Sequence, residues 1–204
     1  MNAFLFLFPA QIYIELLIAN KWINSVGMEQ TVLRRLNEII DKRYRQKDYR
    51  IFWLMFCLDE IARDKPNTTG ICPAVKISPK DQIISCGVTQ DETIVDREDL
   101  RPSIRFDPAN VIAQLPTTVA DLKIGGYHQW DCVNRMAQAT HEQGLPTLVD
   151  EDTTDFYFSK ISRGIEIPDH HDYTIRDFGL ENLPTHLLNH AIRLRAGRPW
   201  FAQD

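Results

Sequence analysis

Cys132 lies where a cysteine could act as a nucleophile. It follows residues 122–126, which are predicted to form a strand, and it lies in the first turn of a predicted helix, 130–143, that stops at Gly144. The free backbone N–H groups and the dipole of a first helical turn stabilise a thiolate and lower its pKa. The same amides could hold an oxyanion, and His128 is close enough along the chain to act as a base. We therefore predict nucleophilic chemistry at Cys132 and His128, the alternative being that Cys132 is a small buried residue, as free cysteines usually are.

Residues near this cysteine could contact a substrate. In an open parallel sheet, ligands bind beyond the carboxyl ends of the strands, so residues just after each strand are the first candidates. The predicted strands 4–8, 122–126 and 146–149 are each followed by such residues. The predicted substrate contacts are Gln11, Tyr127, Gln129, Trp130, Asp150 and Asp152.

The segment from Gly126 to Gly144 resembles the isochorismatase-like cysteine hydrolases. In that family a strand leads through a loop to Cys-Val at a helix start, then to an alanine-rich helix, a glycine and another strand. The matching residues here are Cys132, Val133, Ala137, Ala139, Gly144, Leu148, Val149 and Asp150. Gln11 also fits a glutamine that the family often carries two residues after an aspartate at the end of its first strand. The resemblance implies a hydrolase of small amide- or ester-like molecules that uses Cys, Asp and Lys.

Two positions depart from the pattern that the resemblance implies. Pro9 stands where the aspartate is expected, and the candidates for the lysine are Lys76 and Lys80. The chain is therefore predicted to be either an active hydrolase or a relative that has lost its chemistry. A second class of function is a non-catalytic binding or assembly subunit, in which Trp200 and Phe201 would dock on a neighbouring subunit.

Two polar clusters raise a third alternative, a metal-dependent hydrolase that uses Asp150, Asp152 and His170. One cluster, 150–155, is expected to form an acidic loop after the fifth strand, and the other covers 169–172. Carboxylate oxygens suit hard metal ions, but the spacing matches no metal motif, and consecutive residues point in different directions. We expect no metal and no cofactor, and we expect the acidic loop to be solvated.

The hydropathy pattern predicts one α/β domain over residues 1–204. The expected strands are 4–8, 49–57, 82–88, 122–126 and 146–149, and the expected helices are 28–44, a short helix opening at Asp107-Pro108, 130–143 and 184–196. Strands that alternate with helices favour a mainly parallel sheet with helices on both faces, in three layers. This Rossmann-like order is also the one that the isochorismatase-like resemblance implies.

Composition limits the partners. The net charge of −5 disfavours nucleic acid and acidic membranes, and the basic run 42–50 is expected to be a solvated helix end. The four cysteines include no Cys-x-x-Cys pair, and no stretch approaches the ~20 uncharged residues of a membrane span. We expect a cytoplasmic protein with a small-molecule substrate, and the pattern leaves a homo-oligomer open.

Overall fold

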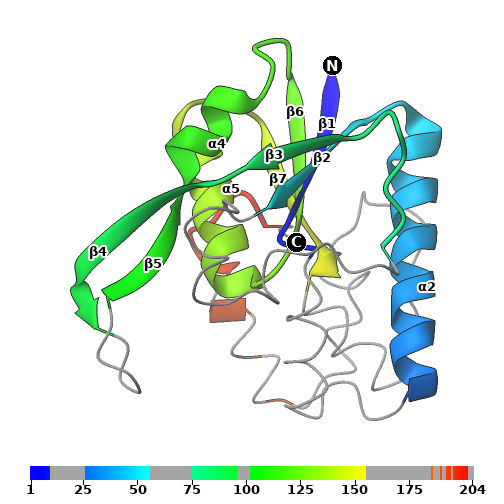
Figure 1. Cartoon of the computed structure of the whole chain (residues 1–204), viewed down its shortest axis with the longest axis horizontal. Coiled ribbons are helices and arrows are strands. Elements are labelled where there is room, and N and C mark those ends of the chain that lie inside the picture. Colours follow the sequence, from blue (N-terminus) through cyan, green and yellow to red (C-terminus); the bar gives the residue numbers. More distant parts are fainter. Residues whose placement is uncertain are drawn as a thin grey trace.

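A five-stranded sheet, parallel throughout, forms the centre of the molecule (Figure 1). The computed structural model describes residues 1–9, 26–55, 75–95, 102–154, 185, 189, 192–193 and 195–201. In spatial order the strands are β3 (Gln82–Ser85), β2 (Arg50–Met55), β1 (Asn2–Leu7), β6 (Asp121–Gly126) and β7 (Thr147–Thr154). The predicted mainly parallel sheet is thus confirmed.

Helices cover both faces of this sheet because its central strand is apolar on both sides. In β1, Phe4 and Phe6 pack against helix α2 (Val26–Arg43), whereas Leu5 and Leu7 belong to the opposite cluster. That second cluster includes side chains of α4 (Pro108–Gln114) and α5 (Asn134–Glu142). Successive strand residues face opposite ways, so a strand between two helical layers must be a continuous apolar run. The predicted three-layer α/β architecture is confirmed (Figure 1).

The segment after β3 differs from the expected single strand 82–88. The chain leaves the sheet at Cys86, and β4 (Gly87–Val95) pairs antiparallel with β5 (Pro102–Asp107) in a separate two-stranded sheet. The strand thus begins at Gln82 as predicted, but it ends at Ser85, and residues 87–88 belong to the second sheet. The short helix predicted to open at Asp107-Pro108 is confirmed as α4, and Asp107 caps it by accepting a hydrogen bond from the Ala109 amide at 2.9 Å.

Within the described residues, no helix is both long enough and apolar enough to cross a membrane.

Candidate functional site

The strand order reverses between β1 and β6, which marks the expected ligand crevice. The chain passes from β1 to β2 and β3 on one side, then returns to place β6 and β7 on the other side. At the carboxyl end of this pair, Leu7 is in register with Gly126, and Leu7 O accepts a hydrogen bond from the Tyr127 amide at 3.2 Å. Open parallel sheets bind ligands outside such a reversal. The candidate site therefore lies at the ends of β1 and β6.

Glycine is required where the two strand ends meet. Gly126 has φ +108°, and a Cβ there would lie 2.2 Å from Leu7 O, closer than any real contact. The chain then runs through a cis Tyr127–His128 peptide into a π-helical turn, η3 (Gln129–Val133), and continues as α5. Cys132 lies in this turn, as the sequence predicts.

The environment of Cys132 favours the thiol over the thiolate. Burial, followed by the negative charge of Asp131, raises the pKa of Cys132 to about 12. The charge of Arg135 and a backbone hydrogen bond at His128 act in the opposite direction but are weaker. The predicted lowering of the pKa is wrong.

Burial is the larger cause of this error, and the way the amides of the turn are used adds to it. The Asp131 and Val133 N–H groups both donate to His128 O, each at 3.1 Å, so these two are satisfied within the backbone. The Cys132 sulfur instead lies 3.9 Å from Asp131 Oδ2. A carboxylate beside a half-buried sulfur disfavours a second negative charge, so this turn does not provide the electropositive setting that activates a cysteine.

The other groups implied by the resemblance do not gather around Cys132 within the described residues. Pro9 follows the end of β1. Lys76 and Lys80 both precede β3, which places them at the amino edge of the parallel sheet, across from Cys132. The chain leaves the carboxyl end of β3 at Cys86. No lysine lies among the described residues directly after β1, β3 or β6, and the segments directly after β2 and β7 lie outside the described residues.

The predicted contacts nearest to Cys132 have different environments. His128 is exposed at the start of the turn. Tyr127 is buried and packs edge-on against Phe6, with ring centroids 5.8 Å apart. Trp130 is half-buried and stacks obliquely on Phe201 at 5.0 Å. Gln11 lies outside the described residues. Of these side chains, His128 is the best placed to meet a ligand.

The acidic residues expected in a loop form the second half of β7 instead. Asp150 and Asp152 are buried, and both bind the fully buried Arg43, through Nη1 at 2.8 Å and Nη2 at 2.9 Å. The Tyr44 hydroxyl also donates to Asp150. The prediction of a solvated acidic loop after a strand that ends at 149 is therefore wrong. The prediction of a solvated helix end is wrong for Arg43. Buried charges persist only when they are paired and hydrogen-bonded, and the partners here are Arg43 at the end of α2 and Tyr44 directly after it.

The opposite face of β7 carries a second buried ion pair. Glu151 alternates with its two acidic neighbours and accepts a hydrogen bond from Arg195 Nη2 on Oε1 at 2.6 Å. Gln129 also donates to Glu151 and accepts from the Thr154 hydroxyl. These side chains tie the turn that holds Cys132 to β7. Gln129, Asp150 and Asp152 are engaged by the protein itself, and a substrate contact by them stays a prediction.

Solved structures share this architecture across the whole chain. A crystal structure described as an isochorismatase family protein covers 100% of this chain and 97% of its own, with a TM-score of 0.52 and 16% identity. An isochorismatase from Pseudomonas putida covers 99% of this chain and 86% of its own, with a TM-score of 0.53 and 10% identity. The fold is that of the isochorismatases. At these identities the likeness concerns the fold, and neither a family model nor a curated protein matches the sequence.

In this isochorismatase fold, the acidic side chains of β7 form ion pairs with arginines, which bears on the metal-dependent alternative. Among the described residues, no group of three or more His, Cys, Asp or Glu side chains could hold a metal ion. Asp150 and Asp152, two of the three residues in the metal-dependent alternative, are bound by Arg43, and the third, His170, lies outside the described residues.

Trp200 and Phe201 belong to the hydrophobic core of this isochorismatase fold. Trp200 and Phe201 are 7% and 1% exposed and belong to the cluster beneath α5. The Trp200 indole donates to Asn134 Oδ1 at 3.0 Å, and Trp200 O accepts from the Val149 amide at 2.7 Å. The prediction that these side chains dock on a neighbouring subunit is wrong, because their own chain buries them.

Proposed function

We propose that this chain is a small-molecule-binding protein built on the isochorismatase fold, and that it does not use Cys132 as a thiolate nucleophile. The observation that carries the proposal is the Asp131 carboxylate, which lies 3.9 Å from the Cys132 sulfur and, together with burial, raises the pKa of Cys132 to about 12. At neutral pH a thiol with that pKa is almost entirely protonated, and the thiol is a far weaker nucleophile than the thiolate. Pro9, in place of an acid at the end of β1, removes an ionisable group that could have accepted the proton.

We place the ligand site at the carboxyl ends of β1 and β6, where the strand order of the sheet reverses. His128 is exposed there and can donate or accept a hydrogen bond, and Trp130 offers part of a flat aromatic surface. Cys132 would line this site as a small, weakly polar residue. The ligand class is a small amide- or ester-like molecule.

The chemical reactivity of Cys132 tests the proposal. We expect iodoacetamide to modify Cys132 slowly at pH 7, with a rate that rises about tenfold per pH unit without a plateau up to pH 10, because only the thiolate reacts. Peptide mapping by mass spectrometry separates Cys132 from the other three cysteines. Asp131→Asn should raise the rate, whereas Asp107→Asn, at another helix start, should leave it unchanged. A plateau between pH 6 and 8 would show a low pKa and overturn the proposal.

A second candidate function is a cysteine hydrolase that activates Cys132 only when its substrate is bound. Two observations favour it: the backbone hydrogen bond at His128 that lowers the pKa of Cys132, and the position of the cysteine just beyond β6. Turnover of p-nitrophenyl acetate or nicotinamide, abolished by Cys132→Ala and retained by Cys86→Ala, would support this candidate over the first.

Three wider expectations accompany the proposal. We place the whole of 1–204 in one domain and the protein in the cytoplasm, where free thiols such as those of Cys86 and Cys132 persist. We also propose that nucleic acid and membranes are not its partners, given the net charge of −5. Sedimentation analysis at several concentrations tests whether the chain forms a homo-oligomer.

A further inference from the structure

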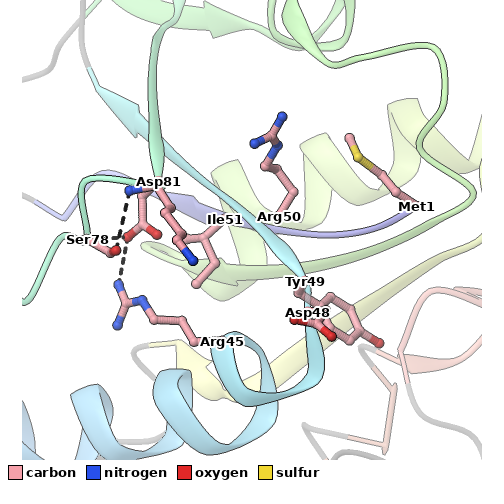
Figure 2. Close-up of a pocket in the computed structure, with 9 residues that line it drawn as sticks. Met1, Arg45, Asp48, Tyr49, Arg50, Ile51, Ser78 and Asp81 are labelled. Atoms are coloured by element: carbon pink, nitrogen blue, oxygen red, sulfur yellow. Dashed lines mark hydrogen bonds and ion pairs between the residues drawn. The ribbon is translucent and has the colours of Figure 1, made fainter.

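A cavity of about 510 Å³ lies at the opposite edge of the sheet from Cys132 (Figure 2). It crosses the amino ends of three adjacent strands, because Ala3 is in register with Arg50 and Phe52 with Gln82. The residues that line it are Met1, Arg45, Asp48, Tyr49, Arg50, Ile51, Ser78, Lys80 and Asp81. Its volume falls within the range of small-molecule sites, roughly 300–1,000 Å³.

One wall of the cavity is held rigidly by a network around Asp81. Asp81 Oδ2 accepts hydrogen bonds from Arg45 at 2.7 Å, from the Trp53 indole at 2.8 Å and from the Ser78 amide at 3.0 Å. Arg45 also donates to Asp41 at 2.6 Å. Figure 2 shows Arg45, Ser78 and Asp81 of this network together, with Arg50 apart from them. The charges of Arg45 and Asp81 compensate each other and fix the shape of the wall.

The remaining charges leave the cavity positive. Arg50 and Lys80 line it, and neither forms an ion pair with another described residue. Arg50 is the first residue of β2, and Lys80 lies in the turn just before β3, the strand next to β2. Against them stands one further carboxylate, that of Asp48. In a chain with a net charge of −5, such a local excess of cations is a specific feature.

We infer that this cavity binds a small phosphate ester, with the phosphate held between Arg50 and Lys80. A dianionic phosphate matches two cations, of which the guanidinium can donate two parallel hydrogen bonds and the ammonium acts as a point charge. The Ser78 hydroxyl can donate a further hydrogen bond. Asp48 can accept from hydroxyl groups on the ester, and Tyr49 and Ile51 provide apolar surface for its carbon skeleton. This site is separate from the one at the strand carboxyl ends.

Calorimetric titration of the whole chain with ribose 5-phosphate tests the inference. We expect saturable binding of ribose 5-phosphate, weaker binding of inorganic phosphate and none of ribose. Arg50→Gln and Lys80→Gln should each weaken binding about tenfold, since each removes a charge-assisted hydrogen bond, and the double variant should abolish it. Lys47→Gln, an exposed lysine outside the cavity lining, and Cys132→Ala should both bind as the unaltered chain does.

Three results would overturn the inference. The first is a lack of saturable binding to the unaltered chain at millimolar ligand. The second is a double variant that is folded by circular dichroism and still binds with unchanged affinity. The third is a loss of affinity in Lys47→Gln as large as that in Arg50→Gln or Lys80→Gln. It would mean that the overall electrostatic field of the surface, and not the cavity, attracts the anion.

Discussion

Replacing Arg43 by methionine should destabilise the protein severely, although the change is far from the candidate site in sequence. Methionine keeps much of the apolar stem but removes both ion pairs, which leaves Asp150 and Asp152 buried without their cation. Breaking a buried pair by removing one partner costs about 3–5 kcal/mol. For a chain of this length, that free energy corresponds to a fall in Tm of roughly 6–20 °C.

Urea unfolding followed by circular dichroism measures this loss, and the chain supplies a matched control. Arg34 pairs with Glu38 at 2.6 Å on the exposed side of α2, with 64% of the arginine side chain exposed. Because solvent screens such a pair, Arg34→Met should cost less than about 0.5 kcal/mol. The two substitutions remove the same side chain from the same helix and differ in burial.

A compensated variant separates the ion pairs from simple loss of packing. If unpaired buried carboxylates cause the loss, adding Asp150→Asn and Asp152→Asn to Arg43→Met should recover part of the stability, because the remaining groups are neutral. An Arg43→Met variant no less stable than Arg34→Met would refute the argument. So would a triple variant less stable than Arg43→Met alone.

Two further substitutions probe the strand ends and the pH dependence. Gly126→Ala should cost at least about 3 kcal/mol in urea unfolding, because it adds a clash with Leu7 O to an unfavourable positive φ. Gly144→Ala also has positive φ but meets nothing within 4 Å, so a loss as large in Gly144→Ala would contradict the role of the close approach. Burial, then Asp150, raises the pKa of Tyr44 well above its usual value, so the stability that this proton supplies is present below about pH 10 and lost as the pH rises further. Tyr44→Phe should therefore flatten the alkaline fall in stability, and an identical fall in both proteins would contradict this assignment.

The regular elements could be predicted because local patterns specify them. The apolar run that became β1 has no polar residue to face solvent, so only a strand between two layers satisfies it. Asp107-Pro108 predicts the start of α4 through capping chemistry that needs no distant partner. The succession of β6, α5 and β7 follows from similar local signals, and the fold class follows from their alternation.

The charged residues could not be placed in the same way. Asp150 pairs with a residue 107 positions away in sequence, and Glu151 with one 44 positions away. A signal for Arg43 was present, since it continues the buried stripe of Leu36, Ile39 and Ile40 on α2. An arginine on such a stripe indicates a buried carboxylate elsewhere in the chain, but it does not say which one.

The sequence by itself determined that this chain forms a parallel sheet between two layers of helices and that Cys132 lies in the turn after β6. Those outcomes depend on apolar periodicity and on capping and turn residues, which act over a few positions. Only the tertiary structure decided that the acids of β7 are buried partners of arginine and that Cys132 lies beside the Asp131 carboxylate in surroundings that raise its pKa. The ionisation and solvation of a side chain depend on desolvation and on charges brought close by distant segments, and these are properties of the packed molecule.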